Sequence, residues 1–283
     1  MSSPVYLKII ITIIIMNKVP VNVNDIKKDE WVTLKVMNID TGVETEEKIN
    51  FKNFLNRYTS IADFWFHGGR YSVVGKCYDK IYWTIQEDVD TACTDGVHLF
   101  FNPLFARQLI QLAQDNMTKE KNKIESEGQN YSDVLKKRKE SSIFGLSVSL
   151  KEYFTFESSK YFLFVIMHEC YHMLYRHVEQ AKRKKETAHP TKYTHWLANT
   201  SMDLEINRDI EFQWPEFKGC AKESEGCWEW NKYGEKDQWA FIFDERFKNK
   251  EEQPDNSSRK EKIIPPFSEE PQGPPPQGPI GGP

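Results

Sequence analysis

The sequence of 283 residues lacks the features that define several large classes of protein. Its five cysteines are an odd number and lie far apart, so they do not form a disulfide framework and instead indicate reduced thiols in a reducing, cytoplasmic compartment. With 38 basic and 42 acidic residues the net charge is −4, which leaves no overall positive field to attract nucleic acid. The sequence also has no internal repeat of the kind that builds solenoids. A secreted disulfide scaffold, a nucleic-acid-binding protein and a repeat protein are therefore not expected.

No apolar run in the sequence is long enough to cross a membrane. The most apolar stretch, at residues 8–16, has about nine residues, against the ~20 that a spanning helix needs. It has the length of a signal-peptide core but lacks a good cleavage site after it. Three interpretations stay open, namely a buried β-strand, an exported leader, and a segment ahead of a translation start at Met16. We expect no membrane partner and treat residues 1–24 as a separate N-terminal segment.

Aromatic side chains, by contrast, are plentiful and predict a sizeable core. They make up 13% of the chain, and hydrophobic residues as a whole make up 39%. We expect one folded domain at residues 25–250. Within it, residues 119–142 are rich in Lys, Glu, Ser and Asn and are expected to form a solvated insertion rather than core. Proline and glycine dominate residues 251–283, which we expect to be an unpacked tail.

Hydrophobic periodicity and turn residues predict a mixture of helices and strands. A β pattern is expected at residues 31–49, in a strand pair at 70–86, and at Gly96–Phe101. Helices are expected at 52–66, from Pro103 to about Met117, from Glu157 to about Lys185, from about Tyr193 to Ile210, and at 237–248. The predicted fold class is α+β, with a small sheet packed on the helix that begins near Glu157.

That helix contains His168-Glu169-Cys170-Tyr171-His172, an HExxH motif. Because positions i and i+4 share a helix face, the two imidazoles can bind one metal ion. Glu169 would stand beside the water that the metal activates and accept its proton. The residues before the motif are apolar, and two histidines and a glutamate inside a buried helix would be costly without a metal or hydrogen bonds. The motif therefore predicts a catalytic zinc ion, with His168 and His172 as ligands and Glu169 as general base.

A zinc hydrolase needs a third protein ligand, and spacing alone does not identify it. Metzincins would carry a third histidine six residues after the motif, where this chain has Val178, which excludes that class. His177 lies about 140° round the helix from the second motif histidine and is poorly aimed at the same ion. In the next helix Asp203 and Asn207 share a face, whereas Glu205 points about 200° away from Asp203. From the residues alone, Asp203 and a gluzincin-like Glu205 both remain candidates.

Two other groups of residues are weaker candidates. Cys220 and Cys227 bracket an acidic loop and would supply half of a structural zinc site, but ordinary buried thiols are the preferred interpretation. Basic residues gather between Arg176 and Lys185, where a solvated helix end is the first interpretation and phosphate contact is the alternative.

Three blocks of sequence together resemble the metallopeptidase domain found upstream of von Willebrand factor A-like domains in bacterial and phage proteins. The first, Thr94–Phe105, is similar to the family's TDG-x-x-L-x-x-NP-x-F strand and turn. The second is the HExxH helix continued to His177, and the third, Asn199–Asn207, is similar to the family's N-x-x-x-D-x-x-x-N helix. The resemblance spans residues 94–247 apart from 119–142, and it departs from the family pattern at Ala198, where a tryptophan is usual.

The resemblance implies a zincin-like metallopeptidase domain with Asp203 as the third zinc ligand. It implies hydrolysis of peptide bonds in a peptide or protein substrate, in the cytoplasm of a bacterial or host cell, and a partner protein or ATPase. We further expect Gly96–Phe101 to offer a sheet edge along which an extended substrate pairs. Asn207, or a nearby tyrosine or histidine, would support either a ligand or the oxyanion.

A hypothesis from another functional class is a metal-stapled module, that is, a non-catalytic binding or assembly protein whose fold is stabilised by its bound metal ion. Glu169 argues against this hypothesis, because a structural site needs no base and usually closes with a fourth protein ligand.

Overall fold

The structure, a computed structural model, describes residues 31–38, 43–67, 71–85, 89, 91–142, 144, 147–187, 192–223 and 238–248. The apolar run at 8–16, Cys227 and the tail at 251–283 lie outside these residues, and so do the expectations attached to them.

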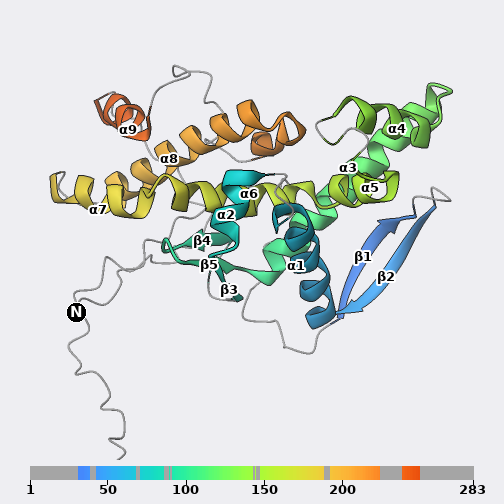
Figure 1. Ribbon diagram of the computed structural model, residues 1–283, viewed down its shortest axis with the longest axis horizontal. Helices are drawn as coiled ribbons and strands as arrows, with labels where there is room; N and C mark the ends of the chain where they lie inside the picture. The colour runs from blue at the N-terminus through green and yellow to red at the C-terminus, as the bar shows by residue number, and fades with distance from the viewer. Residues whose placement is uncertain are drawn as a thin grey trace, which may run out of the picture.

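Helices and short strands alternate in the N-terminal half, and helices alone make up the rest of the described chain (Figure 1). In chain order the elements are β1 (Trp31–Met37), β2 (Glu44–Asn50), α1 (Phe51–His67), α2 (Ser72–Tyr78), β3 (Tyr82–Ile85), β4 (Ala92–Thr94), β5 (His98–Phe101), α3 (Pro103–Ser126), α4 (Tyr131–Ser141), α5 (Leu150–Glu157), α6 (Lys160–Leu174), α7 (His177–Thr187), α8 (Lys192–Gln213), the 3₁₀ helices η2 (Pro215–Phe217) and η3 (Cys220–Glu223), and α9 (Trp239–Lys248).

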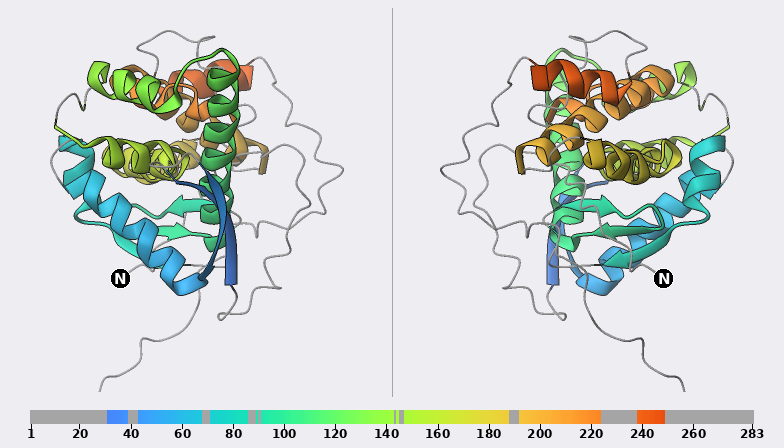
Figure 2. Two further views of the ribbon diagram at one scale, coloured as in Figure 1. Left: turned by 90° about the vertical axis from the view of Figure 1, so that its right-hand side faces the viewer. Right: turned by 90° about the vertical axis from the view of Figure 1, so that its left-hand side faces the viewer.

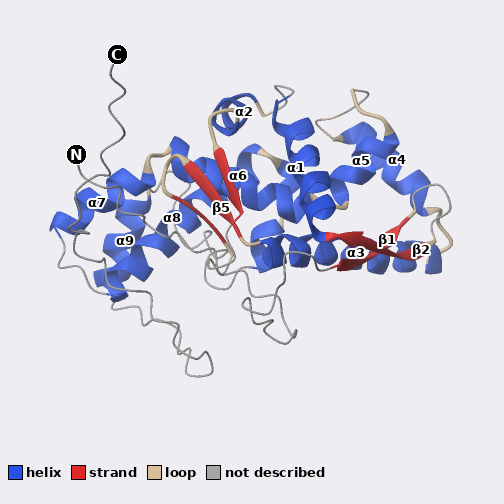
Figure 3. Ribbon diagram, turned by 90° about the horizontal axis from the view of Figure 1, so that it is seen from below, coloured by secondary structure: helices blue, strands red, loops and turns tan. Residues whose placement is uncertain are grey.

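The strands form two small sheets within the described part of the chain. Strands β1 and β2 make an antiparallel hairpin, which lies beside α3 and apart from the other strands (Figure 3). The second sheet has the order β3-β5-β4, with β5 parallel to β3 and antiparallel to β4. The expectation that Gly96–Phe101 forms a free edge is therefore wrong. Strand β5 is hydrogen-bonded on both sides, because β4, which alternation did not reveal, pairs with it.

Helix α6, which carries the HExxH motif, lies at the centre of the molecule. The second sheet covers one side of it and α8 the other, so that α6 is the middle layer (Figure 2). Every residue from Phe162 to His172 is buried, which explains why this helix is apolar on all sides rather than amphipathic. The predicted α+β class is confirmed, and so is the small sheet packed on the motif helix, through β4.

The helix predicted from Glu157 to about Lys185 is instead two helices, α6 and α7, and it does not begin at Glu157. Helix α5 ends at Glu157, and the hydroxyl of Ser159 donates back to the carbonyl of Thr155 at 2.6 Å instead of capping α6. Between α6 and α7, Arg176 has φ of 56°, in the left-handed region that residues other than glycine rarely adopt. This turn moves His177 away from the position that a continuous helix would give it.

The strand pair predicted at residues 70–86 is wrong in its first half, where the chain forms helix α2. Tyr71, Val74 and Tyr78 all face the core, and their spacing of three and four residues is helical. Gly75 allows α2 to approach α1 closely, because a Cβ at this position would overlap the carbonyl oxygen of Phe66.

The charged stretch at 119–142 is less solvated than its composition predicts. It forms the end of α3 and the whole of α4, and Tyr131 and Leu135 belong to the main core. Lys139 is also buried, and its ammonium donates to the carbonyl of Val148 at 3.1 Å. One face of α4 is therefore core, although most of its side chains are charged.

Other expectations agree with the structure. The β pattern at 31–49 is the β1–β2 hairpin, and the helices expected at 52–66, near 193–210 and at 237–248 are α1, α8 and α9. Helix α3 begins at Pro103 as expected but continues past Met117 to Ser126. Of the helices described, none combines the length and the apolar character that crossing a bilayer would take.

Asn102 joins β5 to α3, and we expect its replacement to destabilise the folded protein. Its side-chain oxygen accepts hydrogen bonds from the amides of Leu104 (2.8 Å) and Phe105 (3.3 Å), and its amide group donates to the carbonyl of Val89 at 2.6 Å. Asn102→Ala removes a buried helix cap and leaves a buried carbonyl without its partner. The free energy of unfolding should fall by about 2–3 kcal/mol, as measured by urea denaturation.

The matched control is Asn130→Ala, which removes the exposed cap of α4 and its single bond to the amide of Asp133. This variant should lower the free energy of unfolding by about 0.5–1 kcal/mol. Equal losses in the two variants would contradict the role given to Asn102.

Candidate metal centre

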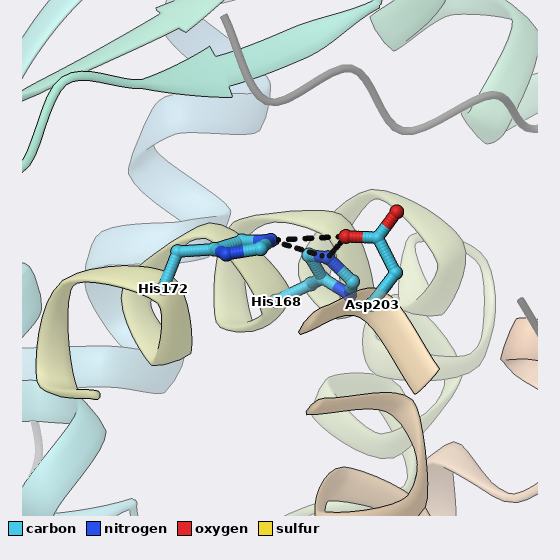
Figure 4. A group of neighbouring side chains, drawn as sticks. All are labelled: His168, His172 and Asp203. Atoms are coloured by element: carbon cyan, nitrogen blue, oxygen red, sulfur yellow. Dashed lines mark hydrogen bonds and ion pairs between the residues drawn. The ribbon is translucent and has the colours of Figure 1, made fainter. Parts of the chain in front are cut away.

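The two motif histidines and Asp203 meet at one point between α6 and α8 (Figure 4). The Nε2 atoms of His168 and His172 lie 3.0 Å apart. Asp203 Oδ1 lies 3.3 Å from His168 Nε2 and 3.2 Å from His172 Nε2. Ligand atoms bound to zinc at ~2.0–2.1 Å and at tetrahedral angles are ~3.3 Å from one another. The three atoms thus have the mutual spacing of ligands around a single ion.

Helix packing explains why these side chains converge. His168 and His172 are one helical turn apart on α6, and α8 packs against that helix. Every residue of α8 from Ser201 to Arg208 is buried, so Asp203 cannot turn to solvent. The predicted juxtaposition of His168, His172 and Asp203 is therefore present in the structure.

Asn207 holds the outer nitrogen of His168. His168 Nδ1 lies 2.7 Å from the side-chain oxygen of Asn207, which sits one turn after Asp203 on the same face of α8. An amide oxygen only accepts hydrogen bonds, so Nδ1 carries the proton. The lone pair on Nε2 of His168 then points into the cluster, as a metal ligand requires.

His177 and Glu205 hold the outer nitrogen of His172 in a similar way. His172 Nδ1 lies 3.0 Å from His177 Nδ1, and His177 Nε2 lies 3.3 Å from Glu205 Oε2. A carboxylate only accepts, so His177 carries its proton on Nε2 and accepts the Nδ1 proton of His172 on its other nitrogen. The Nε2 atom of His172 is then also unprotonated. With Asp203, three lone pairs face one another, an arrangement that a cation stabilises.

The ionisation of the cluster also suits a metal. Burial lowers the pKa of His172 to about 3, against the opposing effect of Asp203. Metal binding needs neutral imidazoles, and this shift keeps the imidazole of His172 neutral at neutral pH.

Glu169 is buried beside the cluster, and neither of its carboxylate oxygens has a hydrogen-bond partner within the described chain. Burial and, to a smaller degree, the nearby charge of Asp203 raise its pKa well above the ordinary value for glutamate. A buried carboxylate without partners is unusual in a structure that satisfies most of its polar groups, and such groups are concentrated at functional sites.

The other sequence candidates lie elsewhere. Glu205 faces His177 and the backbone of Trp239 rather than the cluster, so the geometry favours Asp203 over a gluzincin-like arrangement. Cys220 is buried, and burial raises the pKa of its thiol to about 12. The placement of His177 was not predicted, because it depends on the left-handed turn at Arg176, which no glycine marks.

The cluster is enclosed. His168, His172, Asp203 and Glu169 are each at most 1% exposed. The arrangement can bind a cation and hold a base beside it, but a large substrate reaches it only if the surrounding chain moves.

The chain matches no family model, no curated protein and no solved structure with which it was compared. The resemblance to the metallopeptidase domain that precedes von Willebrand factor A-like domains therefore stays a prediction, as does the partner protein or ATPase that it implies. Any functional conclusion depends on the geometry described above.

Acid should destabilise the metal-free protein through His172. Its pKa is depressed to about 3 in the folded state, while the unfolded chain takes up this proton near pH 6.5. Stability from this group is thus complete above pH 6.5 and is lost as the pH falls toward 3. In the presence of a chelator, the free energy of unfolding should fall between pH 7 and pH 5, by up to about 1.4 kcal/mol per pH unit for one proton.

Urea denaturation at both pH values measures this slope. His172→Gln cannot take up the proton and should show a shallower dependence on pH. The same slope in this variant and in the wild type would contradict the assignment.

Proposed function

We propose that this protein is a zinc-dependent metallopeptidase with a zincin-like site. The observation that carries the proposal is the convergence of His168 Nε2, His172 Nε2 and Asp203 Oδ1 at the spacing of zinc ligands, with both outer imidazole nitrogens already engaged. Two imidazoles and one carboxylate form a three-ligand set that leaves a fourth position open, as in catalytic zinc sites. When bound, zinc would polarise a carbonyl group and lower the pKa of water.

Glu169 would act as the general base. It follows the first ligand, His168, by one residue, and its carboxylate oxygens accept no hydrogen bond from any described group. It would accept a proton from the attacking water and deliver that proton to the leaving amine. The high pKa that burial gives this carboxyl in the metal-free protein is consistent with a group that gains and loses a proton.

An extended substrate would pair with a different strand of the sheet from the one expected from the sequence. Strand β5 is central, whereas β4 is an edge strand of the same sheet and packs against α6. All three residues of β4 are buried, so a peptide substrate would add to this strand, along the helix that carries the motif, only after the chain that covers it moves.

The enclosure of the cluster favours a second candidate function, a binding or assembly module stapled by its metal. With ligands that are at most 1% exposed, a bound ion would join α6 to α8 and stabilise the fold without catalysis. The two candidates differ in what they require of Glu169, since only the peptidase needs its carboxylate.

The protein as purified should hold about one zinc ion per chain. His168→Ala, His172→Ala and Asp203→Ala should each reduce the zinc content sharply, because each removes one of three ligands. Elemental analysis of the purified variants measures this. His98→Ala is the control, since His98 lies at the sheet surface and contacts Asp95. Full zinc content in His168→Ala/His172→Ala would place the metal elsewhere.

Glu169→Gln separates the two candidate functions. It should keep the zinc and the fold but lower peptide hydrolysis by ~10²–10⁴-fold, because an amide cannot accept the proton of water. Cleavage of unfolded proteins and peptide libraries, measured with zinc present, gives the rates. If the wild type cleaves none of them while holding stoichiometric zinc, the peptidase proposal fails and the assembly module stands.

A further inference from the structure

Helix α9 reaches the candidate metal centre through a short chain of polar contacts. The backbone amide of Trp239, the first residue of α9, donates to Glu205 Oε2 at 3.0 Å. The same oxygen lies 3.3 Å from His177 Nε2, and His177 Nδ1 lies 3.0 Å from His172 Nδ1. One carboxylate oxygen and one imidazole thus connect the start of α9 to a candidate zinc ligand.

Each member of this chain is held away from water. His177 is 1% exposed, Trp239 3% and Glu205 9%. Hydrogen bonds to a charged group are stronger in such surroundings, and the loss of one partner leaves the other unsatisfied. The amide of Trp239 also lies at the positive end of α9, which favours the negative charge of Glu205 there. The orientation of the His177 ring therefore depends on both of its neighbours.

The backbone before His177 is arranged for the same contact. Arg176 has φ of 56°, a conformation that is strained for a residue other than glycine. This turn ends α6 and brings the ring of His177 to within 5.1 Å of the ring of His172, measured between centroids. A strained turn next to a candidate site is typical of a segment that has a positioning role.

Apart from the contact with Glu205, α9 packs against α7 and α8 rather than against the main core. The indole of Trp239 donates to the side chain of Gln180 on α7 at 2.6 Å. Arg246 donates to the hydroxyls of Thr200 (2.7 Å) and Ser201 (3.2 Å) on α8. Trp239 also belongs to a small hydrophobic cluster, separate from the main core, with Leu197, Met202 and Phe243. The docking of α9 can therefore change without disturbing the main core.

We infer that His177 and Glu205 are positioning residues for His172, and that the docking of α9 completes them, so that zinc binding and α9 docking stabilise each other. This inference rests on the proposed zinc site. Glu205 determines which nitrogen of His177 carries the proton and holds the plane of its ring. His177 in turn accepts the hydrogen bond from Nδ1–H of His172, which leaves Nε2 of His172 free to bind the ion. Loss of such outer contacts typically weakens metal affinity by ~10–100-fold. By linkage, zinc strengthens the docking of α9 by the same factor by which the docking of α9 strengthens zinc binding.

The first experiment measures zinc affinity in the full chain by competition with a chromophoric chelator. His177→Phe keeps a ring but offers no acceptor to His172, and it should weaken zinc binding ~10–100-fold. His177→Asn, whose side-chain oxygen can stand near the position of Nδ1, should restore most of the affinity. Glu205→Gln, which removes the charge, should weaken binding as well.

The matched control is Val178→Ala, which removes packing from the neighbouring buried residue of α7 but leaves the polar contacts in place. Its zinc affinity should stay within about 3-fold of that of the wild type, a much smaller change than the ~10–100-fold loss expected when an outer contact is removed. A fall in Val178→Ala as large as in His177→Phe would show that packing alone matters and would overturn the inference.

The second experiment needs no variant. Hydrogen exchange of the wild-type chain, with and without zinc, should show slower exchange of the amides of α9 when zinc is bound, while those of α4 stay unchanged. Equal exchange of α9 in the two states, in a protein shown to bind zinc, would overturn the inference and leave the proposed function intact. A wild type that binds no zinc at all would instead refute the proposed function, and this inference with it.

Discussion

The burial of two carboxylates, Glu169 and Asp203, beside two imidazoles is the constraint on which much of this structure depends. Charges in a protein interior are costly unless opposite charges or hydrogen bonds compensate them. Asp203 faces the unprotonated Nε2 atoms of His168 and His172, which do not compensate its charge, and this charge adds to the burial that raises the pKa of Glu169. A divalent cation among these groups would neutralise the excess negative charge, which is the physical basis of the proposed site.

The packing of three helices makes this burial possible. Helix α6 is apolar on every side before the motif, so it fits between the second sheet and α8 (Figure 2). Helix α8 supplies Asp203 and Asn207 from one face to the histidines of α6, and Glu205 from another face to His177 on α7. The left-handed turn at Arg176 contributes to this division, because the residue after it, His177, lies against both His172 of α6 and Glu205 of α8.

The two candidate functions make different demands on the same geometry. A peptidase needs a base next to the ion and access for a peptide, and the unpartnered carboxylate of Glu169 meets the first demand. A metal-stapled module needs only enclosed ligands, and the enclosure of the cluster meets that demand. The peptidase is the stronger proposal, because a buried carboxylate without partners weakens a fold and is otherwise hard to explain.

The features of this protein that depend on local periodicity could be predicted from its amino-acid sequence. The spacing of His168 and His172 placed both on one face of a helix, and Asp203 and Asn207 shared a face for the same reason. Tertiary packing selects Asp203 rather than Glu205 to meet the histidines, because this choice depends on how α8 is rotated against α6. It also determines that β5 is central and that His177 turns back to His172. Strand order and a left-handed turn without glycine arise from contacts between distant residues, and a periodicity of a few residues carries no information about them.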